Sequence, residues 1–251
     1  MAKIKKQRRI FFLIVSVLLV LLLINFIALY YPIFGSLVIQ AQLHVESGVV
    51  LVNSKAVTGI IQLYQGDVIQ TKNGFGTIIL YEHIWTGLQN NTTIIIDDLT
   101  KQHPQIKQES GTTWTKFIKV LGINGFSVAT SNTVASVRAT AFEISDNKLI
   151  ASEGEVEYII DGRKFIVPAF GVVEKKNGVV QTRTATIFEQ DNFKAYFERL
   201  INELKFFQRI QKSQDKSKEL SELIIKIDKN IKEINSFGSV DNSQPEVLTA
   251  D

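Results

Sequence analysis

The chain has 251 residues, with 28 Lys and Arg against 25 Asp and Glu, a formal net charge of +3, and no cysteine. Without cysteine, thiolate catalysis, disulfide bonds and cysteine metal sites are excluded. Five of the cations lie in residues 1–9: Lys3, Lys5, Lys6, Arg8 and Arg9. Removing these five charges from +3 leaves −2 for the rest of the chain, so no basic surface for nucleic acid is expected.

Residues 10–31 follow this basic tail and carry no charged side chain. A helix needs roughly 20 apolar residues to cross the hydrocarbon core, so the segment is predicted to be a transmembrane anchor in contact with membrane lipid. The preceding cations place the N-terminus in the cytoplasm and the bulk of the chain outside it, as a single-pass protein of the cell membrane. A signal cleavage site is poor, because Ile39 would stand at position −3 of a cut after Ala41. The anchor is therefore expected to stay uncleaved.

Short runs rich in β-branched residues recur between turn signals from residue 43 to residue 184. Examples are residues 49–52, 77–80, 93–96 and 165–167. The turn signals are Asn73-Gly74, Asn124-Gly125, Asp161-Gly162 and Asn177-Gly178, which are pairs that adopt the positive φ angles of tight hairpins. The fold class is therefore predicted as mainly β, with one all-β domain over residues 43–184.

Five blocks occur in order through this domain: Gly48-Val49-Val50, then residues 63–71 with Gly66, Asp67 and Thr71, then residues 126–130, then residues 137–143 with Arg138, Thr140 and Phe142, and then residues 150–157 with Glu153 and Gly154. In these blocks the chain resembles a FecR-type domain, the extracytoplasmic module of ferric-citrate-type regulators and of other microbial envelope proteins. The resemblance implies a compact all-β body with solenoid-like or sandwich-like strand packing. Ala139 stands where the family has glycine, so a positive φ there would be strained.

The motif residues also have a structural interpretation. Gly66-Asp67 is expected to form a turn, in which the glycine supplies a positive φ and the aspartate accepts backbone N–H groups, in preference to a ligand site. Arg138 lies among apolar neighbours in the sequence. It is predicted to be a buried clamp bonded to backbone carbonyls or to Glu143 or Glu153, in preference to an anion site.

No motif for catalysis, for a metal or for a cofactor is found in the sequence. His44, His83 and His103 lack the i, i+4 spacing of a helical metal pair, so solvated or core histidines are expected. Asp97-Asp98 follows a strand-like run and is expected in its exit loop rather than in a calcium site. No G-x-S-x-G, P-loop or dinucleotide-binding glycine pattern occurs. The chain is therefore predicted to be a non-enzyme without cofactors.

Two overlapping glycosylation triplets start at Asn90 and Asn91. Such triplets also arise by chance in chains rich in Asn and Thr. They mark two candidate modification sites in a segment that is expected outside the membrane.

Residues 188–237 contain no proline or glycine and show apolar residues at helical spacing. The first stripe comprises Phe193, Phe197, Leu200, Leu204 and Phe207, and the second comprises Leu220, Ile224, Ile227, Ile231 and Ile234. The polar residues 211–218 either separate two helices or form the middle of one long helix. The first stripe is expected to pack on the β domain. The second must be covered either by the first helical block and the β domain or by a second chain, and it is a candidate coiled-coil surface for a partner or for self-association. Residues 238–251 have the composition of a disordered tail.

Three functions are compatible with these features. The preferred one is a membrane-anchored extracytoplasmic interaction module that engages an envelope protein or a surface polymer. The second is a transmembrane signalling regulator, which would act through a membrane partner because about nine cytoplasmic residues cannot form an anti-sigma helical domain. The third is a cell-wall hydrolase, which is disfavoured because the sequence shows no clustered acid pair.

Overall fold

The computed structural model describes residues 19–22, 25, 40–237 and 248–250. The chain divides into two units, residues 1–38 and residues 39–251. The described residues of the first unit, 19–22 and 25, are helical, whereas the predicted tail 1–9 and most of the predicted span 10–31 lie outside the described residues. Among the residues that are described, no helix is both long enough and apolar enough to cross a membrane.

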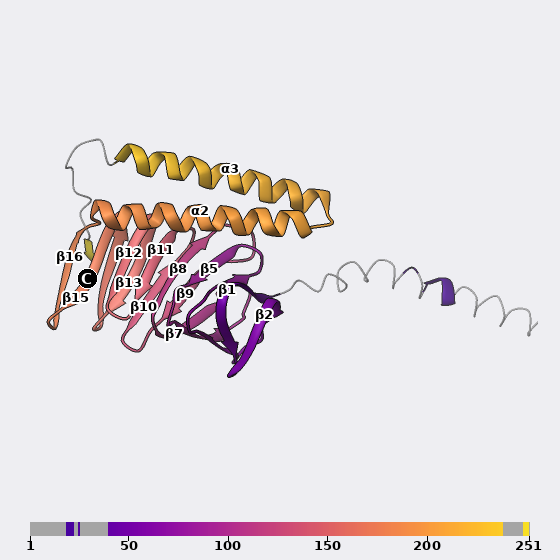
Figure 1. The fold of residues 1–251 in the computed structure, drawn as a ribbon, viewed down its shortest axis with the longest axis horizontal. Coiled ribbons are helices and arrows are strands. Elements are labelled where there is room, and N and C mark those ends of the chain that lie inside the picture. Colours follow the sequence, from indigo (N-terminus) through magenta and orange to yellow (C-terminus); the bar gives the residue numbers. More distant parts are fainter. Residues whose placement is uncertain (1–18, 23–24, 26–39, 238–247, 251) are drawn as a thin grey trace, which may run out of the picture. The chain divides into compact units, whose positions relative to one another are not determined.

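The second unit is mainly β, as the sequence predicts, and two long helices follow the strands (Figure 1). The strands are β1 (Ala41–Val52), β2 (Lys55–Gln62), β3 (Val68–Thr71), β4 (Phe75–Leu80), β5 (Ile84–Leu88), β6 (Thr93–Asp98), β7 (Gln105–Ser110), β8 (Thr112–Phe117), β9 (Phe126–Ala129), β10 (Thr133–Val137), β11 (Ala141–Ser145), β12 (Lys148–Glu153), β13 (Glu155–Ile160), β14 (Arg163–Pro168), β15 (Gly171–Lys176), β16 (Val179–Thr184) and β17 (Leu248–Ala250). The helices are α2 (Ile187–Ile210) and α3 (Gln214–Phe237).

Strand pairing joins the strands in two series that share β1 and β2. The first series, called the helix-facing layer below, runs β2-β1-β4-β5-β8-β11-β12-β15-β16. The second series runs β2-β1-β3-β6-β7-β9-β10-β13-β14-β17, and its β7–β9 pair is parallel whereas the other pairs are antiparallel. The two series therefore meet at one end of the body, in β1.

A bend in β1 allows this strand to belong to both series. Residues up to Ser47 pair with β4, and residues from Val50 onward pair with β3. Gly48 lies at the bend with a φ of +71°, and a Cβ added there would lie 1.9 Å from the Asn73 carbonyl oxygen. Only glycine fits this close approach of two backbone segments.

Side chains from the two series meet in a core between them. Ile78 and Phe142 come from the helix-facing layer and Val128 and Tyr158 from the other series, and all four are fully buried in one cluster. Of the two packings implied by the resemblance, the strands thus form the sandwich-like one.

The opposite face of the helix-facing layer carries a second core. Ile79, Trp85, Trp114, Ile150 and Val172 are buried there together with side chains of α2 and α3. Figure 1 shows α2 lying across these strands. Because β4 is covered on both faces, it has the continuous apolar run of residues 78–80 instead of an alternating pattern.

α2 begins with a capping box. The Thr186 hydroxyl oxygen accepts from the Glu189 N–H at 3.2 Å, and the Glu189 carboxylate accepts from the Thr186 N–H at 2.9 Å. The stripe residues Phe193, Phe197, Leu200 and Leu204 are at most 3% exposed, which confirms that the first stripe packs on the β domain. Gln211 has an extended backbone, with φ −75° and ψ 125°, so the polar segment separates two helices.

α3 turns back along α2 (Figure 1). Its stripe faces the second core, where Ile227 is fully buried and Ile231 and Ile234 are 8% and 7% exposed, while Leu220 and Ile224 are partly buried. The prediction that this stripe is a coiled-coil surface for another chain is therefore wrong, because α2 and the β body of the same chain cover it.

The end of the chain contributes one strand. β17 pairs antiparallel with Lys164–Ile166 of β14, so the prediction of a disordered tail over 238–251 is wrong for residues 248–250, whereas residues 238–247 and 251 lie outside the described residues. The unpaired edge of β14 offers backbone donors and acceptors, which explains why a short strand adds there.

Candidate functional site

A groove, called the helix-turn groove below, lies between the helix-facing layer and the turn that joins α2 to α3. Its volume is about 540 Å³, within the roughly 300–1,000 Å³ of sites that hold small molecules. The apolar side chains that line it are Ile60, Ile79, Trp85, Ile118, Phe207, Ile210, Leu220 and Leu223. Ile60 and Ile210 are 40% and 51% exposed, so the apolar lining extends to the mouth.

Ionisable side chains surround the apolar floor of the groove. They are Glu82 and His83 from the β4–β5 turn, and Lys216, Glu219, Glu222 and Lys226 from α3. The Lys216 ammonium donates to the Glu82 carboxylate at 2.5 Å, which ties the start of α3 to the turn. Burial lowers the pKa of His83, although Glu219 and Glu82 act in the opposite direction, so His83 is neutral at pH 7.

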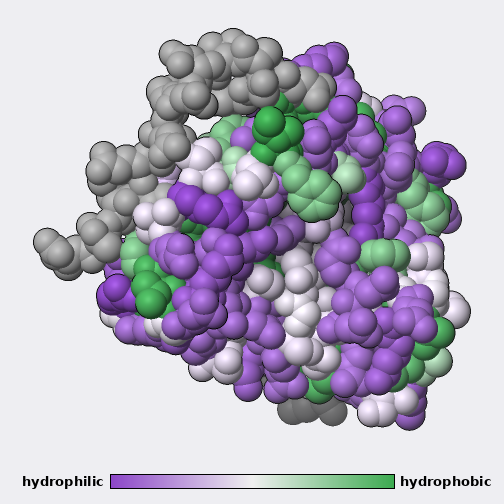
Figure 2. Space-filling view, turned by 60° about the vertical axis from the view of Figure 1, so that its left-hand side comes forward, coloured by the Kyte–Doolittle hydropathy of each residue, from purple (hydrophilic) through white to green (hydrophobic). Residues whose placement is uncertain are grey.

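The surface drawn in Figure 2 contrasts with the groove. This face is mainly hydrophilic, and its hydrophobic residues form small separate patches. Scattered exposed apolar residues are normal for a folded domain. The groove combines a concave shape, an apolar floor and a polar rim, and it is therefore the candidate binding site.

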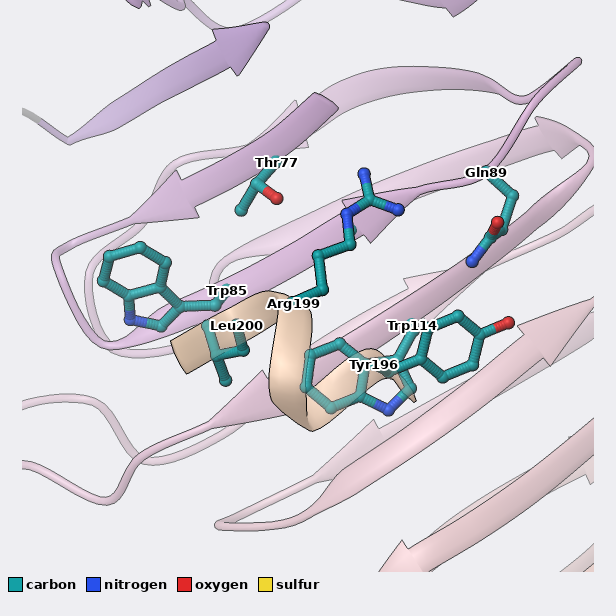
Figure 3. A pocket seen from close by; sticks show the side chains of 8 residues that line it. Thr77, Trp85, Gln89, Trp114, Tyr196, Arg199 and Leu200 are labelled. Atoms are coloured by element: carbon teal, nitrogen blue, oxygen red, sulfur yellow. The ribbon is translucent and has the colours of Figure 1, made fainter. Parts of the chain in front are cut away.

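A second hollow under α2 is filled by side chains. Figure 3 shows the residues around it: Tyr196, Arg199 and Leu200 from α2, and Thr77, Trp85, Gln89 and Trp114 from the layer below. Its volume is about 10 Å³, roughly the space that one water molecule needs. This hollow belongs to the packing of α2 and is too small for a ligand.

Arg199 fastens α2 to β1 beside this hollow. Its guanidinium donates two hydrogen bonds to the Glu46 carboxylate, at 2.6 and 2.8 Å, and lies over the Phe75 ring at 4.5 Å from the centroid. The Thr77 hydroxyl donates to the same carboxylate at 2.7 Å. The bidentate geometry fixes the position of the helix along the strand.

Two of the three histidines make contacts that hold the fold. His44 Nδ1 lies 2.6 Å from the Glu203 carboxylate, and its ring stacks on Phe206 at 4.3 Å. Burial raises the pKa of Glu203, which the nearby Glu46 raises further and the bond to His44 lowers. His103 Nε2 lies 2.7 Å from the Ser127 hydroxyl. Within the described residues, no three His, Asp or Glu side chains converge as a metal site would require.

A buried cation lies below α3. Lys116 is 4% exposed and forms an ion pair with Glu153, whose carboxylate also accepts from the Asn230 amide. Burial lowers the pKa of Lys116, and Lys226 lowers it further, to about 7. The Glu153 carboxylate favours the charged form of Lys116. The ion pair joins β8 to β12 within the helix-facing layer, and the hydrogen bond from Asn230 connects it to α3.

The Gly66-Asp67 block forms a turn that stabilises the fold, as expected. Gly66 has a φ of +90°, and the Asp67 carboxylate accepts from the Tyr64 N–H at 2.8 Å and from the Asn53 amide at 2.7 Å. The buried Thr71 hydroxyl accepts from the Thr92 N–H at 2.9 Å. The Asp67 carboxylate and the Thr71 hydroxyl are thus both bonded within the chain.

Arg138 departs from its prediction. Its side chain is exposed, so the buried clamp is wrong. The two acids proposed as its partners contact other groups: Glu143 accepts from the Tyr196 hydroxyl at 2.8 Å, and Glu153 pairs with Lys116. The chain bends out of β10 at this point, which carries Arg138 and Ala139 to the surface. Ala139 is not among the residues with positive φ, so it is not strained.

The remaining motif residues lie close together in the body. Phe142 is fully buried in the core between the series, and Thr140 is 3% exposed. Gly154 has a φ of +66°, and an added Cβ would lie 2.8 Å from Thr140 Cγ2. Glycine is required there by both the backbone angle and the contact.

Asn90 and Asn91 are exposed in the turn between β5 and β6. The hydroxyl of Thr92, which belongs to the first triplet, is directed inward and donates to the Thr112 carbonyl at 3.1 Å. Asp97 and Asp98 are the last two residues of β6, so they do not lie in its exit loop as expected. The Asp98 carboxylate accepts from the Thr100 N–H at 2.7 Å in the loop that follows.

No family model matches the sequence, and no curated protein matches it. Two crystal structures of a candidate anti-sigma factor from Parabacteroides distasonis are similar to part of the fold, both at 14% identity and a TM-score of 0.45. The matches cover 51% and 55% of this chain, and 64% and 72% of the other chain. At this level the likeness carries no argument about function.

The sequence analysis did not identify the groove, although it named three of its lining residues, His83, Phe207 and Leu220, in other contexts. The lining residues come from five strands or strand ends and from two helices, so no short motif contains them. The usable signal was the apolar run 78–80, which indicates a strand covered on both faces. The run indicates that both faces of β4 are covered. It does not indicate that the covering helices leave a groove at one end of the layer.

Proposed function

We propose that the chain is a non-catalytic interaction module, anchored in the cell membrane by residues 10–31 with its N-terminus in the cytoplasm, and that its extracytoplasmic β domain engages an envelope protein or a surface polymer. The helix-turn groove carries this proposal. It is concave and apolar with a polar rim, which is the usual character of a binding site.

The polar residues near the groove support binding rather than catalysis. Lys216 pairs with Glu82 across the rim, and Lys116 pairs with Glu153 below α3. A catalytic acid or base must be within hydrogen-bond reach of a substrate, whereas these groups bond to the protein itself. We therefore assign the groove to recognition.

The resemblance to a FecR-type domain favours a second candidate function, signal regulation through a membrane partner. The sequence blocks that carry the resemblance form turns and core contacts in this chain. Asp67 stabilises a turn, and Phe142 is buried in the core. In that role, occupation of the groove would change the contacts of the domain with the partner.

Membrane topology is tested by adding protease to spheroplasts that express the full chain. The cations in residues 1–9 predict that the β domain is degraded while the span is protected. A β domain that survives in intact spheroplasts and is degraded only after lysis would contradict the extracytoplasmic assignment.

The binding site is tested with a photo-crosslinking amino acid in place of Leu223, which lines the groove. The matched control replaces Val179 of β16, which is 62% exposed and far from the groove in the strand order. We expect irradiation of intact cells to give discrete adducts from the Leu223 position alone. Equal adducts at both positions, or none at either, would refute the groove as the recognition site.

A further inference from the structure

The helix-turn groove lies at the end of the domain where the chain enters β1. The Gln40 carbonyl accepts from the Tyr81 N–H at 3.0 Å, and Gln42 lines the groove. Its other walls at this end are Ile60 of β2 and Ile79 of β4, the strands that flank the first half of β1. The groove is thus built beside the first strand of the domain.

This position limits the distance between the groove and a membrane. If residues 10–31 span the bilayer, as in the proposed function, residues 32–39 are the connection to Gln40. About eight residues reach at most roughly 28 Å when fully extended. In the proposed function, the start of the first strand can therefore lie no more than roughly 28 Å from the end of the span.

The chemistry of the groove matches the interface of a bilayer. The floor is apolar, and Ile60 and Ile210 keep it apolar up to the mouth, where they are 40% and 51% exposed. The rim carries carboxylates at Glu82, Glu219 and Glu222 and ammonium groups at Lys216 and Lys226. Charges of both signs around an apolar floor suit a zwitterionic headgroup at the mouth and a hydrocarbon chain inside.

We propose that the helix-turn groove binds an acyl chain of a membrane phospholipid, with the headgroup at the charged rim. The inference rests on the proposed function in one respect, the membrane anchor. Bound lipid would hold the groove end of the domain against the bilayer and fix the orientation of the remaining surface toward other envelope components.

Tryptophan emission gives a direct test. The chain has two tryptophans; Trp85 lines the groove and Trp114 does not. The full chain is reconstituted in phosphatidylcholine vesicles whose acyl chains are native or brominated, because bromine quenches tryptophan at contact distance. Brominated vesicles are expected to quench the Trp85 emission. The quenching should persist in Trp114→Phe and disappear in Trp85→Phe.

Two variants separate binding in the groove from mere closeness to the bilayer. Leu223→Glu places a charge in the groove, and Ile210→Glu places one at its mouth. Because the Ile210 side chain is exposed, its replacement should have little effect on folding. Both should lose the quenching while their circular dichroism stays unchanged. Quenching that is retained in both variants would overturn the proposal, as would its absence in the unmodified chain.

Flotation of the same vesicles in a density gradient distinguishes failure of acyl-chain binding from failure of the membrane anchor. A chain that floats with the vesicles but is not quenched would refute acyl-chain binding and leave the membrane anchor intact. A chain that does not float would refute the anchor, and with it the lipid assignment that depends on it.

Discussion

The docking of α2 on the β body can be tested at Phe197. This side chain is 1% exposed in the second core, and its ring meets Trp114 edge-on at a centroid distance of 5.3 Å. Phe197→Ala would remove the ring from the interface between α2 and the helix-facing layer. Phe188→Ala is the matched control, because it makes the same change in the first turn of the same helix, where the side chain is 74% exposed.

The magnitude follows from the burial of the ring. Removal of a fully buried Phe side chain costs about 3–5 kcal/mol, from lost transfer free energy and from the cavity that remains. A domain is typically stable by roughly 5–15 kcal/mol, so the variant should fold with a much lower unfolding midpoint. The control should change the free energy of unfolding by no more than about 0.5 kcal/mol, because its ring stays in water in both states.

The two tryptophans report on the same interface. Trp85 and Trp114 are 2% and 4% exposed beneath the helices, and they are the two tryptophans of the chain. Urea titration of the full chain in detergent is followed by tryptophan emission and by circular dichroism. Each signal gives its own midpoint of unfolding. We expect the emission midpoint to fall strongly in Phe197→Ala and to remain in place in Phe188→Ala.

Equal shifts of the emission midpoint in Phe197→Ala and Phe188→Ala would refute this account of the second core, because the helical layer would then not depend on the buried ring. A different result would be an emission midpoint at a much lower urea concentration than the circular dichroism midpoint in Phe197→Ala. In that case α2 undocks while the sandwich stays folded, and the two cores unfold separately.

Three further predictions concern single sites. Hydrogen bonds from the Arg183 guanidinium lower the pKa of Glu189 from 4.5 to about 2. The stabilisation of the fold by the charged Glu189 is therefore present above pH 4.5 and lost as the pH falls toward 2. Glu189→Gln should remove roughly 1–2 kcal/mol of this pH dependence, measured as unfolding midpoints from pH 7 to pH 3. Gly59→Ala should lower the free energy of unfolding by roughly 1 kcal/mol, and Gly48→Ala by several times as much, as measured in thermal melts. Both glycines have a φ near +70°, but only Gly48 faces a backbone oxygen. Equal losses would contradict the close approach at Gly48. Arg138→Ala should leave the melting temperature unchanged, since the side chain is exposed, and a large loss would restore the buried clamp.

The local features of the chain follow from short stretches of sequence. Asp161-Gly162 and Asn177-Gly178 form the hairpin turns that their residue types indicate, with φ of +50°, +74°, +51° and +79°. The same prediction is wrong for Asn73-Gly74 and Asn124-Gly125, which have no positive φ. Periodicity separated the helical region from the strands, and the Gly66-Asp67 turn has the predicted positive φ and carboxylate contacts. These features depend on interactions between residues that are a few positions apart, so residue type and spacing are sufficient to predict them.

Interactions between distant segments were decided only by the tertiary structure. The apolar stripe of α3 shows which face of the helix is buried, but a partner chain and α2 would leave the same pattern, and the structure shows that α2 covers it. Arg138 has apolar neighbours in sequence, yet the chain leaves β10 there and exposes it. The helix-turn groove exists because α2 and α3 turn over one end of the layer. Sequence patterns record that a surface is buried, whereas the shape and the identity of what covers it depend on how all the layers pack together.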